Sequence, residues 1–369
     1  MHDGILTGEA RMSFFKKLFQ VPSFLYLSPA GVDISNHAIT YILFEKIHGG
    51  LHVRTHGRVP LAPDTYKDGV ILRRDALIKA LLEVKRRLPT SFVKVSIPEE
   101  ASYIFSVRIP YEARGSIAEQ ILFKLEENVP LKVSEVSITY DVVKEPHART
   151  GDDLLVVASV VPKKVSEEIA SACASAGLSI VSFGIEPKVL AKAVVMKRDH
   201  RAIMIVHIKE YSTSMTYTAG GIVRFASTVA VGNAAIREGI MKINPKLYDA
   251  QGIFVGTPAT FDAESFYSLL NVFSVIKEEI KKFSAYVSAQ AEKHNESIPG
   301  KIDEVIIVGD AAAIPGLAAH IGQNIDMNIV LGNVWTNAFD INRYVPQVSF
   351  AESLGEAVAV GCALPSFKK

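Results

Sequence analysis

The sequence predicts an α/β fold built from two similar halves, because one pattern of strand, short polar turn and strand occurs twice in the chain. The first copy spans Gly31 to Glu45 and the second spans Ala202 to Tyr217. Branched and aromatic residues on both sides of Ser, Asn and Thr are typical of a β-hairpin. With 369 residues and 49% hydrophobic content, the chain is long enough for two sizeable cores. We therefore expect a cleft between the two halves.

The other elements follow from the hydrophobic periodicity. Residues 74–88 predict a helix, because Leu77, Leu81 and Val84 share one face while Lys and Arg occupy the other, and Pro89 follows. A compact α+β unit is expected over residues 103–161. The remaining predicted elements are strands at 93–98, 180–183 and 305–308 and helices at 165–176, 187–196, 232–242, 261–291 and 315–321.

Composition excludes several classes of protein. Forty basic and thirty-nine acidic residues leave a net charge of +1, so contact with nucleic acid or anionic lipid would need a local patch. The two cysteines, Cys173 and Cys362, lie far apart in apolar surroundings, which fits buried free thiols in a reducing compartment. No apolar stretch has the roughly 20 residues of a membrane span, and no P-loop, zinc-protease or secretory motif is present. These features indicate a cytoplasmic protein with no nucleic-acid partner.

Several segments, in a fixed order, carry a resemblance to a known family. They are the turn Val32 to Asn36, the stretch 95–143, the segment Gly184 to Ala191 and the segment Val305 to Leu317. Together they resemble the PilM family of type IV pilus assembly proteins, which are actin-like and related to the cell-division protein FtsA. The resemblance covers nearly the whole chain, from about Pro29 to Leu364. It implies a duplicated actin-like, ribonuclease H-like fold with an inserted α+β subdomain in the first half.

The same resemblance divides the chain. It implies a lead-in at 1–28, a first actin-like half at 29–101 and 163–199, an inserted subdomain at 102–162, and a second half with the nucleotide-side lobe at 200–365. The lead-in contains a basic and aromatic run from Met12 to Phe19. That run either lies in a bilayer interface or docks its Phe side chains on a partner or on the protein itself.

In actin-like ATPases an acidic residue on the incoming strand positions a hydrated Mg²⁺, and N–H groups of the turn bind phosphate. By resemblance, Asp33 is the metal-side residue, and Ser35 and Asn36 belong to the nucleotide-binding turn. Ser35 replaces the glycine of that turn and loses its positive φ, although Asn36 tolerates left-handed backbone and would allow a shifted turn. Alternatively, Asp33 only satisfies backbone N–H groups of its own turn.

The second half departs further from the family pattern. His207 stands where the family has its second acidic residue, and Lys209 stands at the turn glycine. Lys209 either neutralises a phosphate directly or forms a solvated turn pair with Glu210. His207 is either a hydrogen-bonded histidine of the cleft or a ligand. Gly309 and Asp310 would face the adenosine, in a loop that keeps one glycine of three.

Two functions remain open. The first is a cytoplasmic scaffold at the inner membrane with a degenerate nucleotide cleft. The resemblance implies that such a scaffold binds the N-terminal cytoplasmic tail of a PilN-like protein and other pilus assembly components, while self-association stays open. Phe105, Ile121 and Leu125 are the expected apolar walls of the groove for the tail, or else simply core. The second function is an ATPase that binds ATP and Mg²⁺ and hydrolyses ATP slowly.

Overall fold

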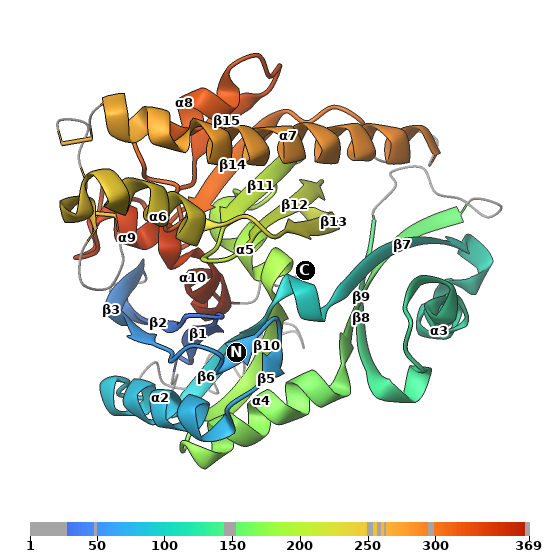
Figure 1. Ribbon diagram of the computed structural model, residues 1–369. Helices are drawn as coiled ribbons and strands as arrows, with labels where there is room; N and C mark the ends of the chain where they lie inside the picture. Colours follow the sequence, from blue (N-terminus) through green and yellow to red (C-terminus); the bar gives the residue numbers. More distant parts are fainter. Residues whose placement is uncertain are drawn as a thin grey trace, which may run out of the picture.

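Two five-stranded sheets form the centres of the two halves (Figure 1). The computed structural model describes residues 28–47, 50–143, 153–248, 254–256, 260–261, 263–293 and 299–365. In the first half the strand order is β10-β6-β1-β2-β3. The bounds of these strands are β1 Ala30–Ile34, β2 Ala38–Ile47, β3 Gly50–Pro60, β6 Phe92–Ile97 and β10 Ser179–Ile185.

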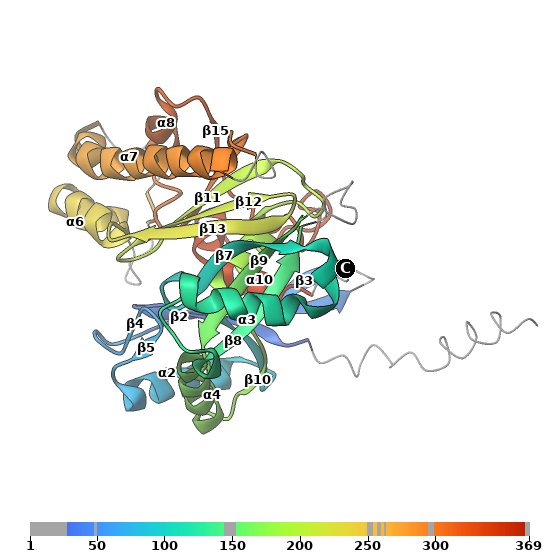
Figure 2. The ribbon, with the colours of Figure 1, turned by 90° about the vertical axis from the view of Figure 1, so that its right-hand side faces the viewer.

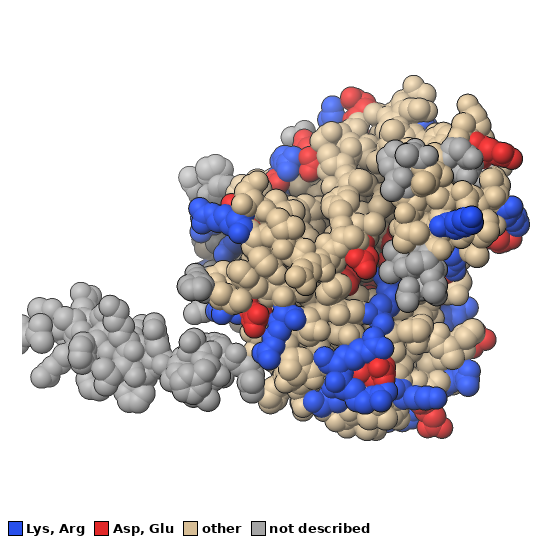
Figure 3. Space-filling model, turned by 90° about the vertical axis from the view of Figure 1, so that its left-hand side faces the viewer, with Lys and Arg blue, Asp and Glu red and all other residues tan. Residues whose placement is uncertain are grey.

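Helices cover both faces of the first sheet. One face packs on α2 (Arg74–Arg87) and α4 (Lys163–Ser175), whose apolar residues form a core with the strands. The outer side of α2 carries Lys and Arg, which gather in the lower part of the face drawn in Figure 3. The other face packs on α10 (Ala357–Ala363), and the approach is so close that a Cβ at Gly31 would collide with the backbone of that helix. The sheet is therefore buried on both sides.

The second half repeats this plan with the strand order β13-β12-β11-β14-β15. Its first strands form the second hairpin, in which Ala202 pairs with Ala219 and Ile208 pairs with Thr213. Both hairpins expected from the sequence are therefore confirmed. The elements of this half are β11 Ala202–Ile208, β12 Thr213–Ala219, β13 Ile222–Val229, α6 Asn233–Ile243, α7 Ala263–Lys293, β14 Glu304–Gly309, α8 Leu317–Gly322, β15 Asn328–Leu331 and α9 Phe350–Gly355.

A third, smaller sheet with the order β7-β9-β8 projects from the first half (Figure 2). Its elements are β7 Tyr103–Pro110, α3 Ile117–Asn128, β8 Val136–Val142 and β9 Asp153–Pro162. Three short elements precede them in the chain, namely β4 Tyr66–Lys67, β5 Val70–Ile71 and η2 Glu99–Ala101. One face packs on α3, while Leu155 and Val157 on the other face join the main core with α5 (Glu186–Val194). This arrangement is the expected inserted α+β unit, and its exact boundaries stay a prediction.

Two expectations from composition can be compared with the structure. Cys173 and Cys362 are buried free thiols. None of the helices in the described part of the chain is both long enough and apolar enough to cross a bilayer. The basic and aromatic run from Met12 to Phe19 lies outside the described residues.

Candidate functional site: the cleft between the two halves

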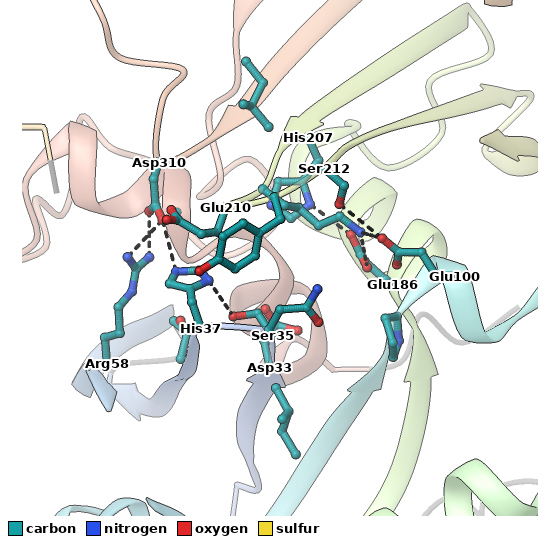
Figure 4. A pocket seen from close by; sticks show the side chains of 18 residues that line it. Asp33, Ser35, His37, Arg58, Glu100, Glu186, His207, Glu210, Ser212 and Asp310 are labelled. Atoms are coloured by element: carbon teal, nitrogen blue, oxygen red, sulfur yellow. Dashed lines mark hydrogen bonds and ion pairs between the residues drawn. The ribbon is translucent and has the colours of Figure 1, made fainter. Parts of the chain in front are cut away.

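The ends of the two hairpins meet in a cleft between the halves (Figure 4). Five predicted nucleotide-site residues line it, namely Asp33, Ser35, Asn36, Lys209 and Asp310, and Gly309 directly precedes the last of these. The free volume of this cleft is about 50 Å³, whereas small-molecule sites typically enclose about 300–1,000 Å³. The sequence thus identified residues that lie together, but the space between them is too small for a nucleotide.

Asp33 lies at the end of β1 and is mostly buried. Its carboxylate accepts a hydrogen bond from Ser96 Oγ on the adjacent strand β6 at 2.5 Å. Burial, together with the nearby negative charge of Glu186, raises the pKa of Asp33 to about 6, against partial opposition from Ser96. Its hydrogen-bond partner is thus the side chain of another strand, which differs from the expected role of satisfying N–H groups in its own turn.

The first turn is held by its own side chains. Ser35 Oγ accepts from the backbone N–H of Ala38 at 3.2 Å and donates to the carbonyl of the same residue at 2.9 Å. Asn36 and Asp68 exchange two hydrogen bonds of 2.9 and 3.0 Å. Among the described residues, the positive-φ positions that are not glycine are Asp64, Asp68, Arg198 and Asn324. The prediction that Asn36 supplies a left-handed, shifted turn is therefore wrong.

The second turn carries a buried cluster of opposite charges. Glu186, at the start of α5, accepts hydrogen bonds from His207 Nδ1 at 3.0 Å and from Lys209 Nζ at 3.5 Å. Lys209 Nζ also donates to Glu100 Oε1 at 2.6 Å. Burial alone would raise the pKa of Glu186, but the charge of Lys209 and the hydrogen bond from His207 outweigh it and lower this pKa to about 2. The Glu186 carboxylate consequently stays ionised against the ammonium.

Lys209 and Glu210 are therefore not a solvated turn pair, and that prediction is wrong. Burial would lower the pKa of Lys209, but Glu186 and Glu100 raise it above its usual range. The Glu210 side chain is 4% exposed and pairs with Arg237 on α6, with a further hydrogen bond from Asn233. The two turn residues therefore pair with separate partners within the protein.

The backbone of the second turn is fixed against the start of α6. The carbonyl oxygens of Lys209 and Glu210 accept hydrogen bonds from the N–H groups of Asn233 and Ala234 at 2.8 Å each. A Cβ at Gly232 would meet these carbonyl oxygens, so glycine permits the close approach. N–H groups at the start of a helix commonly donate hydrogen bonds to phosphate. Here the carbonyl groups of the turn accept these hydrogen bonds, so the N–H groups of Asn233 and Ala234 cannot bind an anion.

The loop predicted to face the adenosine is filled by an ion pair between the halves. Arg58 on β3 donates two hydrogen bonds to the Asp310 carboxylate, at 2.9 and 2.6 Å, and His37 Nε2 lies 3.8 Å from the same group (Figure 4). Burial would raise the pKa of Asp310, but the positive charge of Arg58 outweighs burial and lowers it. A Cβ at Gly355 would collide with this carboxylate, so the glycine lets the chain close over the pair.

Further contacts hold the two halves together outside the charge clusters. Thr228 on β13 donates a hydrogen bond to Glu99, and the His52 ring stacks on Tyr344 with centroids 4.0 Å apart. No group of three His, Cys, Asp or Glu side chains in the described part of the chain is arranged to hold a metal ion. The acidic groups of the cleft are engaged by protein cations and hydroxyls, so these residues do not fit ATP and Mg²⁺ in this arrangement.

Several important residues were not singled out from the sequence. Glu186 lies in the segment Gly184 to Ala191, which contributed only to the family resemblance, and no sequence pattern indicated a role for Glu100, Arg58 or Arg237. One usable signal was present: Lys209 and Glu210 directly follow a strand that is apolar except for His207, and a charged side chain beside such a strand needs a partner. The identity of that partner lies far away in the sequence.

The predicted partner-binding residues lie elsewhere than expected. Ile121 and Leu125 on α3 are 0% exposed, and Phe105 is partly buried against both of them in the core of the inserted unit. Ile121 and Leu125 cannot contact a partner in this arrangement, so for these two residues the alternative, core, is correct. Phe105 is partly exposed, and its role in partner binding stays a prediction. Their apolar periodicity reflects packing between α3 and the small sheet.

An open groove lies beside the inserted unit instead. It has a free volume of about 490 Å³ and is bounded by β8, α5 and the turn between β12 and β13. Lys188 Nζ and Asp141 Oδ2 form an ion pair of 2.9 Å across it. Tyr140 is 40% exposed on β8, which is an edge strand of the small sheet.

Comparisons with known proteins agree with this architecture. The sequence pattern of the family described as "Type IV pilus assembly protein PilM" matches residues 31–367. No curated protein sequence matches the chain. Among solved structures, the chain is similar to a protein of the "PilM-PilN type IV pilus biogenesis complex", with 16% identity, a TM-score of 0.67, and coverage of 91% of this chain and 98% of that one.

Two other solved structures are less similar. Ethanolamine utilization protein EutJ from Carboxydothermus hydrogenoformans has 14% identity and a TM-score of 0.47, over 95% of this chain and 98% of that one. MreB 5 of Spiroplasma citri bound to AMPPNP has 11% identity and a TM-score of 0.48, over 90% and 95%. The fold is the actin-like fold. The match over residues 31–367 shows that the chain belongs to the PilM family of type IV pilus assembly proteins.

Proposed function

We propose that this protein is a nucleotide-independent scaffold of type IV pilus assembly, which binds the cytoplasmic tail of a PilN-like inner-membrane protein. One observation carries the proposal: Lys209 lies between Glu100 and Glu186 in a cleft with a free volume of about 50 Å³. The positive charge that a nucleotide site would obtain from a metal ion is here part of the chain.

The internal ion pairs make the closed arrangement independent of a ligand. Arg58 and Glu100 come from the first half of the molecule, and Asp310 and Lys209 come from the second. Removing one partner from a buried pair costs roughly 3–5 kcal/mol, because the other charge stays buried and unpaired. Opening the cleft for a nucleotide would separate these pairs and place a triphosphate near several carboxylates.

The groove beside β8 is the surface that supports peptide binding best. An edge strand presents unpaired N–H and C=O groups, to which an extended peptide adds as a further strand. The groove has a free volume of about 490 Å³ and brings together the inserted unit, α5 and the second half. A tail bound there would also hold the protein at the cytoplasmic face of the inner membrane, through its partner.

The structurally similar protein named above comes from a complex of PilM with PilN. This supports a PilN-like partner for the present chain as well. The alternative function, a slow ATPase, rests on Asp33, which keeps the metal-side position of the first turn. That activity would require the cleft to open against the pairs Arg58–Asp310 and Lys209–Glu100.

The test is equilibrium binding of the cytoplasmic tail peptide of the PilN-like protein encoded with this chain. We expect micromolar affinity, about −8 kcal/mol, with the same value in the presence and absence of Mg·ATP. Tyr140→Asp and Ile222→Asp, on opposite sides of the groove, should each weaken binding at least about tenfold because a charge enters the peptide site. Tyr267→Asp on α7, where the side chain is 68% exposed and outside the groove, is the matched control.

Two results would overturn parts of the proposal. Unchanged affinity in Tyr140→Asp and Ile222→Asp, with melting temperatures equal to that of the unmodified protein, would remove this groove as the site. Binding that appears only with Mg·ATP would exclude the nucleotide-independent scaffold.

A further inference from the structure

The outer side of α2 carries an excess of positive charge that the rest of the chain does not share. Residues 73–87, which comprise this helix and its N-cap, contain six basic and two acidic residues, whereas the whole chain has a net charge of +1. Figure 3 shows Lys and Arg gathered on the lower part of this face around acidic side chains. Because the net charge of the whole chain is close to zero, contact with an anionic surface needs a local patch of this kind.

Few of these charges are neutralised within the protein. Glu83 serves both Arg86 and Arg87, so one carboxylate faces two guanidinium groups. No ion pair involves Lys79 or Arg73 among the described residues. By contrast, α7 pairs its exposed lysines one to one with acids, as in Lys281 with Glu278 and Lys282 with Glu279. The positive field is therefore a property of α2 and not of exposed helices in general.

Exposed apolar side chains lie among these cations. Leu82 is 45% exposed and lies one helical turn from both Lys79 and Arg86. Val70 and Leu72, just before the helix, are each 52% exposed. Basic residues around an apolar side chain on one helix face are typical of a helix that lies on a bilayer, with the apolar group in the headgroup region.

We infer that the outer face of α2, with Leu82 among its Lys and Arg side chains, binds anionic membrane lipid directly. A lipid surface fits better than nucleic acid, because it accepts Leu82 into an apolar phase while the headgroups pair with Lys and Arg. Each Lys or Arg near an anionic bilayer contributes about fivefold to partitioning. This contact is separate from the groove beside β8 and does not depend on the tail of a partner.

The experiment is co-sedimentation of the full chain with vesicles of phosphatidylcholine that contain about 30% phosphatidylglycerol, compared with phosphatidylcholine alone. We expect binding only to the anionic vesicles, with strong weakening as salt rises from about 50 to 300 mM. The variant Lys79→Glu/Arg86→Glu/Arg87→Glu should bind at least about 100-fold more weakly. The matched control is Lys277→Glu/Lys281→Glu/Lys282→Glu on α7, which should bind like the unmodified protein.

A second variant separates lipid from other polyanions. Leu82→Ser should weaken vesicle binding about threefold or more without changing the salt dependence, because it removes only the inserted apolar group. Equal vesicle binding by the α2 triple variant and the unmodified protein overturns the inference. A second result would also overturn the inference. If the triple variant loses double-stranded DNA binding as much as vesicle binding, and Leu82→Ser does not change vesicle binding, the surface binds nucleic acid.

Discussion

The cleft between the halves and the groove beside β8 differ in almost every physical respect. The cleft has about 50 Å³ of free space and is crossed by ion pairs of 2.6 to 3.5 Å. The groove has about 490 Å³, an exposed edge strand and the ion pair Lys188–Asp141 across it. At the position where an actin-like protein is expected to bind its nucleotide, charged side chains of this chain pair with one another, whereas the larger open space lies beside the inserted unit.

The largest expected effect comes from removing the central cation of the cleft. Lys209→Met leaves Glu100 and Glu186 buried without their shared ammonium group, so the free energy of unfolding should fall by about 3–5 kcal/mol. Urea denaturation followed by circular dichroism measures this loss. Lys282→Met, at a lysine that is 71% exposed on α7, should change the same quantity by less than about 0.5 kcal/mol. A loss below about 1 kcal/mol in Lys209→Met would mean that this cluster does not hold the cleft closed.

A somewhat smaller effect is expected at the second ion pair between the halves. Arg58→Met should lower the free energy of unfolding by about 3 kcal/mol, because Asp310 remains buried and unpaired. The double variant Arg58→Met/Asp310→Leu should recover most of that loss, since no unpaired charge remains. A double-mutant cycle measures the coupling. Strictly additive single losses would show that the two side chains do not interact across the cleft.

The smallest expected effect has the opposite sign. The pKa of Asp33 is raised to about 6 from 3.8, so the folded state holds a proton that the unfolded state has released, and stability falls as pH rises from about 4 to 6. Asp33→Asn removes this penalty and should raise the free energy of unfolding at pH 7.5 by no more than about 3 kcal/mol.

The control for this comparison is Asp326→Asn, at a side chain that is 98% exposed, which should leave stability and its pH dependence unchanged. Glu186 provides the converse behaviour: its pKa is lowered to about 2, so its contribution is present above pH 4.5 and lost as pH falls from there. A destabilised Asp33→Asn protein at pH 7.5 would indicate that the carboxylate stabilises the cleft in its ionised form.

Local patterns explain what the sequence predicted well. The helix expected at 74–88 is observed at Arg74–Arg87, because hydrophobic periodicity and a following proline are properties of neighbouring residues. Both hairpins were predicted for the same reason. The family resemblance further predicted that Asp33, Lys209 and Asp310 lie in one cleft, because in that fold the ends of the two hairpins and of this loop meet.

The partners of the cleft residues could not be predicted from such patterns. Arg58 and Asp310 are 252 residues apart, and Glu100 and Lys209 are 109 apart, so no periodicity joins them. The groove prediction failed for another reason: the apolar face of α3 is equally suited to a core and to a peptide site, and only the packing of Ile121 and Leu125 against the small sheet decides between them. Sequence patterns predict which faces are apolar, but not what covers them.

The most direct test of the closed cleft is calorimetric titration of the full chain with Mg·ATP, combined with thermal unfolding in about 1 mM ligand. We predict no saturable heat and no change in melting temperature, because the chain's own charges occupy the cleft. A dissociation constant below about 100 μM would instead stabilise the protein by about 1.4 kcal/mol at that concentration. Such binding, if abolished by Asp33→Ala, would contradict the account and show a cleft that opens to nucleotide.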